Sequence, residues 1–361
     1  MENFENISWE NPPSPAECKK ELKKIRGSLR KRNSLIVLTS LVLAAALLFG
    51  TVQYGIPALE SRYWDPRTVS FGTEKGTDLD MVLAAYTELF SPTTYFQGTR
   101  VNHTGFASYS ITVMTLNETT NEIRESYCSI EESELFIPHG VWDTVSFDKV
   151  GNYWTSMAEE FPEKIGQQRD ISYRILGQLP AYVRVSAYVT FTEEKTLWEL
   201  FDFRDGLSGV DWYDETHLLW TEIRHGDKTD NSPRCGFSAS TLTDIYSEVN
   251  KRYPAFSERQ AYDELYQYEE RNYKEKTYTA HFKSLLKYLD DQLKNGTGIP
   301  APASATGEVD MDYYAKALAY VEENGVKACG CYIVSTPEHL LKIMEREDVL
   351  VLIPDEAWIN I

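Results

Sequence analysis

The chain has 361 residues, of which 36 are Lys or Arg and 55 are Asp or Glu, so its formal net charge is −19. The first 50 residues hold eight basic and five acidic side chains, whereas the remainder has 28 basic and 50 acidic and a net charge of −22. Nucleic acid and anionic membrane surfaces repel a domain this acidic, so we expect no direct nucleic-acid partner. A hydrophobic content of 42% and the length allow one large or two modest domains.

Residues 1–33 form a basic tail that we expect to lie in the cytoplasm. A helix should begin there with Ser14 as its N-cap, Pro15 at the first helical position and Glu17 completing a capping box. Apolar residues then recur four, three and four positions apart, with basic residues around them: Cys18, Leu22, Ile25 and Leu29. One interpretation is an interfacial helix that lies on anionic lipid. The other is a docking helix that binds a cytoplasmic protein through Leu22, Ile25 and Leu29.

Residues 34–54 form an uncharged apolar run directly after the basic tail, SLIVLTSLVLAAALLFGTVQY. At about 1.5 Å per residue, this helix would extend about 32 Å, enough for a hydrocarbon core of about 30 Å. Eight basic residues precede the run, whereas Arg62 and Arg67 alone follow it over a comparable stretch. The sequence therefore predicts a single-pass protein of the cell membrane with its C-terminal part outside. A signal peptide cleaved at the alanines 44–46 is the less favoured alternative, because the basic segment is long and apolar residues continue past them.

Residues 55–178 are expected to form a membrane-proximal, β-rich region outside the cell. The Gly-Ile-Pro run at 55–57 should end the helix as it leaves the lipid. A short capped helix is predicted over 78–90. Dense β-branched and aromatic residues predict short strands within 94–150, and a further helix is expected over 152–164.

Residues 179–361 are expected to form a C-terminal α+β domain. Strands are predicted over 182–191, 211–223, 326–334 and 349–353, and helices over 196–204, 256–294, 310–324 and 337–345. The first and last parts of this domain share one order: strand, Thr-containing cap, short helix, loop and strand. This order favours two βαβ units, with helices on one face of a sheet.

Two neighbouring thiols, Cys329 and Cys331, should share one face of a strand, since residues i and i+2 do so. They could be a small buried apolar pair, or one of them could form a disulfide with Cys128 or Cys235 in an oxidising compartment. Metal or redox chemistry is a third interpretation of the pair.

No catalytic constellation is evident in the sequence. Ser284 and Lys287 have the S-x-x-K spacing of penicillin-recognising enzymes, but the accompanying K-T-G element is missing, and we expect these residues on a solvated helix face. The histidines show no metal-ligand spacing. We therefore predict a protein that is not an enzyme, with no catalytic, cofactor-binding or metal-binding residues.

Three stretches resemble a known family: KKIRGSLRKRNSLIVLTSLVL with its exit YGIPALESRYWDP, then SAYVTFTEEKTLWEL with VDWYDE, and finally VKACGCYIVSTPEHLLKIMEREDVLVL. Together they cover most of residues 19–355 and are similar to the membrane-anchored sigma factor regulators of Gram-positive bacteria. The resemblance implies a transmembrane anti-sigma factor whose tail restrains an alternative sigma factor and whose outer domain receives an envelope signal. It implies no catalytic residues. The chain departs from many anti-sigma domains because no histidine precedes His103, so the tail lacks their zinc cluster.

Other functions fit the same pattern. One is a membrane-anchored envelope sensory or interaction module that binds an extracytoplasmic ligand and has no sigma partner, its tail contacting only the lipid bilayer. A membrane-tethered hydrolase is less favoured, because no catalytic constellation accompanies it.

Overall fold

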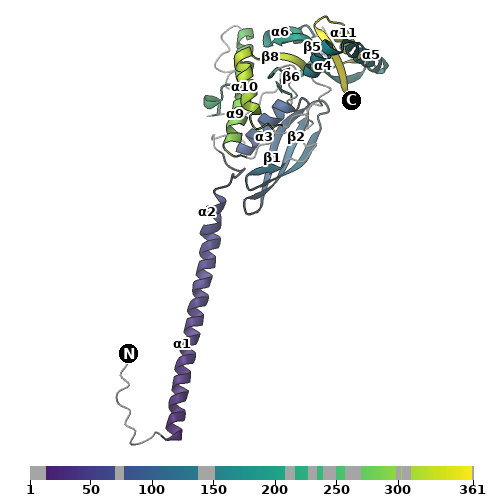
Figure 1. Cartoon of the computed structure of the whole chain (residues 1–361). Helices are drawn as coiled ribbons and strands as arrows, with labels where there is room; N and C mark the ends of the chain where they lie inside the picture. The colour runs from purple at the N-terminus through teal and green to yellow at the C-terminus, as the bar shows by residue number, and fades with distance from the viewer. Residues whose placement is uncertain are drawn as a thin grey trace. The chain divides into compact units, whose positions relative to one another are not determined.

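The computed structural model describes residues 14–69, 77–136, 151–207, 216–226, 234–238, 249–256, 270–297, 302 and 310–359. The chain divides into two compact units, Met1–Arg62 and Tyr63–Ile361. The first is helical, and the second combines two antiparallel sheets with helices (Figure 1). A mixed α+β fold with an apolar N-terminal helix is thereby confirmed.

Residues 15–60 of the first unit form one continuous helix in three segments: α1 (Pro15–Gly50), the π-helical turn η1 (Thr51–Gly55) and α2 (Ile56–Glu60). Among the residues that the structure describes, it is the one helix long and apolar enough to cross a membrane. The predicted capping box is confirmed, because the Ser14 hydroxyl accepts from the Glu17 N–H and the Glu17 carboxylate accepts from the Ser14 N–H.

The helix does not end at the Gly-Ile-Pro run of residues 55–57, contrary to the sequence prediction. In η1 the hydrogen-bond ladder widens, so that the N–H of Ile56 donates to the carbonyl of Thr51, five residues earlier. Pro57 lies in the first turn of α2, directly after this widened turn, and the helix continues through the proline. The helix ends at Glu60, with Ser61 as its C-cap.

The second unit begins with α3 (Asp78–Phe90), which packs on a four-stranded antiparallel sheet. The strands, in their spatial order, are β1 (Thr94–Gly105), β2 (Ser108–Asn117), β3 (Ile123–Glu131) and β4 (Glu134–Phe136). The predicted helix is confirmed, and Thr77 and Asp80 form its capping box. Leu79 and Leu83 are buried with Ile111 against the sheet, and full burial of such a side chain contributes about 1.5–3 kcal/mol.

A five-stranded sheet forms the rest of the framework, in the order β7-β6-β8-β5-β9. Its strands are β5 (Val183–Thr196), β6 (His217–Ile223), β7 (Cys235–Ser238), β8 (Lys327–Ser335) and β9 (Val349–Ile359). Helix α6 (Leu197–Asp205) follows β5, and α11 (Pro337–Met344) follows β8. Thr196 and Thr336 cap these helices, as the sequence predicted.

The expected βαβ units do not form with adjacent strands. Strands β5 and β6 both pair antiparallel with β8, and β8 and β9 both pair antiparallel with β5. Each predicted unit therefore has two parallel strands with a strand of the other unit between them, which is a split β-α-β arrangement. The two units interleave, and every hydrogen-bonded pair of strands in the described sheet is antiparallel.

Helices α4 (Gly151–Glu160) and α5 (Pro162–Gln178) lie against this sheet. From α5, Arg169 Nη1 donates to the carbonyls of Val349 and Leu350 at 3.0 Å each, and the Ser172 hydroxyl donates to that of Leu352 at 2.6 Å. These bonds cover carbonyl groups of the edge strand β9, which would otherwise offer a pairing template.

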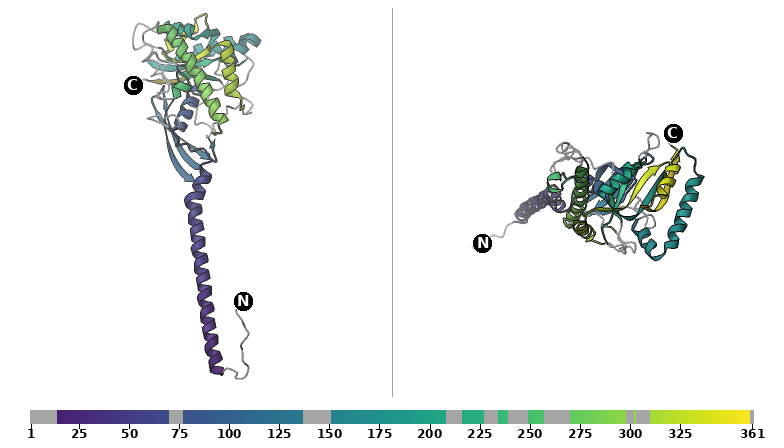
Figure 2. Two further views of the ribbon diagram at one scale, coloured as in Figure 1. Left: turned by 90° about the vertical axis from the view of Figure 1, so that its left-hand side faces the viewer. Right: turned by 90° about the horizontal axis from the view of Figure 1, so that it is seen from above.

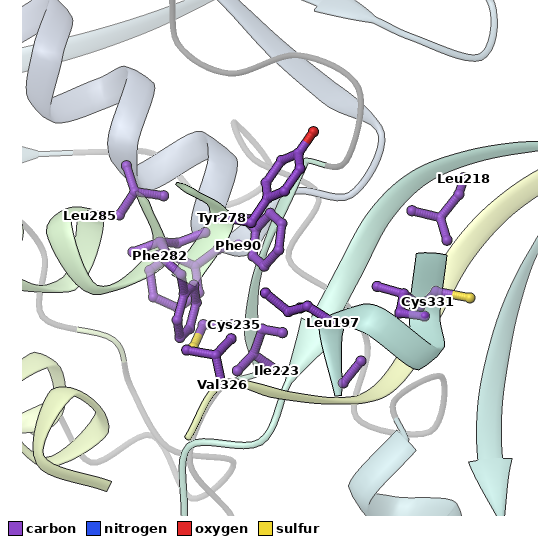
Figure 3. Close-up of a cluster of buried hydrophobic side chains, with 14 of the residues drawn as sticks. Phe90, Leu197, Leu218, Ile223, Cys235, Tyr278, Phe282, Leu285, Val326 and Cys331 are labelled. Atoms are coloured by element: carbon purple, nitrogen blue, oxygen red, sulfur yellow. The ribbon is translucent and has the colours of Figure 1, made fainter. Parts of the chain in front are cut away.

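The main core lies between the five-stranded sheet, α3 and the helices α7 (Val249–Arg252), α9 (Glu270–Lys294) and α10 (Tyr313–Asn324). Figure 3 shows Phe90 of α3 close to Tyr278 and Phe282 of α9, all of them buried. Gly325 ends α10 with a φ of 78°, the left-handed conformation that glycine adopts readily. The expected elements over 211–223 and 256–294 lie partly outside the described residues, and β6 and α9 are their described parts.

Candidate functional site

The three predicted partner-binding residues of the tail lie together on one face of α1. Leu22, Ile25 and Leu29 follow one another at intervals of three and four residues, which places them on adjacent turns of the helix. Their exposed fractions are 54%, 53% and 52%. We call these three side chains the tail stripe.

Basic side chains border the tail stripe along one flank, Lys19, Lys23, Arg26 and Arg30, whereas Glu21 lies on the other flank. An apolar strip in a basic border can bind a groove with an apolar floor and an acidic rim, or it can lie on anionic lipid. The two alternatives require different helix geometries. A helix on the lipid surface has to bend where it joins a membrane span.

Helix α1 continues from the tail into the apolar run without a break (Figure 2). Every residue from Pro15 to Gly50 is α-helical, including Arg32 and Asn33 at the expected lipid boundary. Leu22 precedes Ser34 by 12 residues, so the stripe extends to about 18 Å beyond the apolar run at about 1.5 Å per residue. This geometry favours a tail that projects from the membrane over one that lies on it.

Comparison with known proteins does not identify a function for these residues. No family model, curated protein or solved structure matches this chain. The likeness to sigma factor regulators therefore stays an expectation from residue patterns, and the function has to be inferred from the chain's own residues.

The cysteines of the second unit are buried and free. Of the interpretations given for Cys329 and Cys331, the structure has the buried pair, with no bridge to Cys128 or Cys235. Burial raises the pKa of Cys128 to about 11 and that of Cys235 to about 12, so both are thiols at neutral pH. Within the described part of the chain, no group of three or more His, Cys, Asp or Glu side chains could hold a metal ion.

The S-x-x-K residues of α9 have structural partners. The Ser284 hydroxyl donates to the carbonyl of Pro254 at 2.6 Å, and Lys287 Nζ donates to the Asp291 carboxylate at 3.0 Å. Ser284 is only 4% exposed, so the expected solvated face is wrong for this residue. The helix buries it because its hydroxyl satisfies a carbonyl of the turn at residues 253–256.

Sequence reasoning missed a buried pair in the second unit, Glu88 of α3 and His281 of α9. His281 Nε2 lies 2.9 Å from Glu88 Oε1, and His281 Nδ1 lies 2.8 Å from the Ala255 carbonyl oxygen. Because that carbonyl can only accept, Nδ1 donates, and Nε2 and the Glu88 carboxylate then share one further proton. The indole N–H of Trp220 donates to the Glu88 carbonyl, so the pair joins α3, α9 and β6. The two residues are 193 positions apart, and no spacing motif could have indicated them.

A cavity of about 280 Å³ lies where β5 departs from β8. Thr190 pairs with Gly330 and Lys195 with Ala328, so the four residues 191–194 of β5 oppose a single residue of β8. Bulges of this kind open a sheet and often border binding sites. The lining includes residues 191–194, together with Thr155, Arg224 and Cys329.

The Arg224 guanidinium beside this cavity is nearly desolvated, whereas 29% of the Glu194 side chain is exposed. Arg224 is 2% exposed, and its Nε donates to Glu194 Oε1 at 2.9 Å. The guanidinium donates hydrogen bonds, whereas the carboxylates of Glu193 and Glu194 accept them. A small polar ligand with both donor and acceptor groups would suit this lining.

Proposed function

We propose that this chain is a single-pass regulator of the cell membrane, which restrains an alternative sigma factor through its tail in response to a signal at its second unit. The tail would be cytoplasmic and the second unit extracytoplasmic, because the basic residues precede the apolar run. The observation that carries the proposal is the exposed tail stripe on a helix that continues into the apolar segment.

The tail stripe fits helix-in-groove recognition. Leu22, Ile25 and Leu29 occupy positions i, i+3 and i+7, the spacing of anchor residues in amphipathic helices that bind apolar grooves. Burying each anchor in a partner would contribute at most about 1.5–3 kcal/mol, before the entropy cost of association. The three anchors would therefore supply only part of the free energy of a specific, reversible complex.

The continuous helix also supports a route for the signal. Because α1, η1 and α2 form one helix, a displacement at its outer end moves the tail stripe with it. A ligand of the second unit can drive that movement only if it binds two states of the protein with different affinities.

Co-purification with the full-length chain in detergent tests the tail stripe. The test variant replaces Leu22, Ile25 and Leu29 by Gln, which removes the apolar surface and preserves helix propensity. The matched control replaces Lys20, Lys24 and Lys31 by Gln on the opposite face of the same helix. We expect the stripe variant to lose an alternative sigma factor that the wild type and the control retain.

Two results would contradict this proposal. Capture that survives the stripe substitutions would show that the tail does not dock through these side chains. Loss of capture in the lysine control alone would indicate non-specific attraction by positive charge. The genomic neighbourhood is a cheaper indicator, since a sigma factor gene directly upstream would support the proposal.

The cavity beside Arg224 favours a second candidate function, an anchored envelope module that binds a small polar ligand and has no sigma partner. Ligand binding to the second unit together with absence of any sigma capture would support this alternative. The substitution Arg224→Met should then abolish ligand binding, because it removes the guanidinium donors and retains much of the side-chain volume.

A further inference from the structure

The cavity beside Arg224 owes its shape to the bulge of β5, which is held in place on its outer side. The Thr192 N–H donates to the Asp348 carbonyl at 3.2 Å, and the Thr192 hydroxyl donates to the Glu347 carbonyl at 3.4 Å. The bulge is therefore tied to the segment that leads into β9 and cannot simply close onto β8. Its volume of about 280 Å³ lies just below the range of about 300–1,000 Å³ for drug-sized ligands, which suits a smaller molecule.

The guanidinium of Arg224 has more donors than partners. Its Nε donates to Glu194 Oε1, and Nε is the one guanidinium nitrogen that has a hydrogen-bond partner within the described part of the chain. Nη1 is buried without a partner. Buried donors without acceptors are unfavourable, and more so when they carry charge. The terminal nitrogens of this side chain therefore lack an anionic acceptor, which a ligand in the cavity can supply.

Two carboxylates stand directly beside this cation. Glu193 and Glu194 line the cavity from the bulge, and Glu193 is exposed at its rim. The neighbouring ammonium of Lys195 does not neutralise them, because its Nζ lies 3.0 Å from the Asp348 carboxylate. A ligand that carries only negative charge, such as an inorganic phosphate, would be repelled by these carboxylates. The lining therefore requires an anionic group for Arg224 and a cationic group for the two glutamates.

The spacing of these charges indicates the spacing of the ligand's own charges. Because Glu194 Oε1 lies 2.9 Å from Arg224 Nε, the cation and the anion of the site are adjacent. A complementary molecule must carry its two opposite charges equally close together. An α-amino acid does so, since its ammonium and its carboxylate are attached to one carbon atom. Its carboxylate also has the planar shape that a guanidinium binds best.

We propose that this cavity binds a free α-amino acid. The carboxylate of the ligand accepts hydrogen bonds from Arg224, and its ammonium donates to Glu193 and Glu194. Its side chain packs against the uncharged part of the lining, Phe191 and Cys329, which are 1% and 2% exposed. The inference deepens the proposed function, because it names the chemical class of the signal, and it rests on that function for the role of the ligand but not for its binding.

Isothermal titration calorimetry of the full-length chain in detergent, with each common L-amino acid in turn, tests the binding. We expect at least one amino acid to bind. Three analogues of that amino acid then test the chemistry: its amide, which lacks the carboxylate, the deaminated acid, which lacks the ammonium, and γ-aminobutyrate, which carries both charges further apart. Each should bind about 10- to 150-fold more weakly, since a charged hydrogen bond is lost or misplaced.

A rim variant connects this selectivity to the named residues. Glu193→Gln removes one partner of the ammonium, and its exposed position makes it compatible with folding. It should weaken binding of the amino acid by about tenfold or more and leave binding of the deaminated acid unchanged. The matched control is Glu134→Gln in β4, the same chemical change at an exposed position of the other sheet, which should alter neither affinity.

Three results would overturn the inference. One is the absence of binding by every amino acid of the panel. Another is equal affinity for the amino acid and for its amide, for γ-aminobutyrate or for sulfate, which would indicate a site of different chemistry. The third is unchanged selectivity in Glu193→Gln. Sigma capture without amino-acid binding would remove only this inference, whereas amino-acid binding without capture would remove only the proposed restraint of a sigma factor.

Discussion

Gly236 is the position at which a single methyl group should destabilise the second unit most clearly. A Cβ at this residue would lie 1.9 Å from the carbonyl oxygen of Thr221 and 2.5 Å from the Trp220 ring, whereas an ordinary contact is at least 3.4 Å. Strand β7 would therefore have to move away from β6 by about 1.5 Å. Its neighbour Phe237 is 1% exposed and stacks on Tyr278 of α9, so the core resists this movement. Overpacking costs about 1–3 kcal/mol, and the backbone clash places Gly236→Ala near 3 kcal/mol.

Thermal unfolding of the full-length chain in detergent, followed by near-ultraviolet circular dichroism, measures this effect. A loss of about 3 kcal/mol should lower the Tm by about 6–12 °C for a domain of this size. The matched control is Gly166→Ala in α5, where an added Cβ meets nothing within 4 Å. This control should stabilise the helix by about 0.5–1 kcal/mol. A Gly236→Ala protein that melts together with the wild type would refute the close packing of β7 on β6.

Two further predictions concern titratable groups. The Arg346 guanidinium, with Lys195 nearby, holds the pKa of Asp348 at about 2, below its ordinary value of 3.8. The carboxylate therefore stabilises the fold above pH 3.8 and loses this contribution as the pH falls towards 2. With 31% of the side chain exposed, we expect an acid titration of unfolding to lose about 1 kcal/mol in this window, and Asp348→Asn to abolish that loss. A maleimide should modify Cys18 alone in the folded chain and all five cysteines after denaturation, whereas a second thiol that reacts rapidly before unfolding would contradict the burial of the others.

Helix boundaries were predictable where capping depends on neighbouring residues. Ser14 and Glu17, like Thr77 at the start of α3, form hydrogen bonds over three positions, and the sequence shows both partners. The stop at Gly325 was predictable for the same reason, because a left-handed residue ends a helix locally. The Gly-Ile-Pro run misled the prediction, because a π-helical turn accommodates the proline without ending the helix.

The features that sequence reasoning missed depend on residues far apart in the chain. Each predicted βαβ unit has the right local order, but β8 lies between β5 and β6 because the two units interleave. The same limit applies to Glu88 and His281, which meet only after α3 and α9 have packed. The tail stripe was predictable because helical periodicity is local, but the unbroken passage of α1 into the apolar run was not.

Run-off transcription is the sharpest test of the proposed restraint of a sigma factor by the tail stripe. RNA polymerase with an alternative sigma factor that the full-length chain captures would transcribe that factor's own promoter, with increasing amounts of the chain in micelles. We expect the wild type to suppress transcripts in proportion to the sigma factor it holds, and the variant with Gln at Leu22, Ile25 and Leu29 not to suppress them. Equal suppression by both proteins, or none by the wild type, would contradict it.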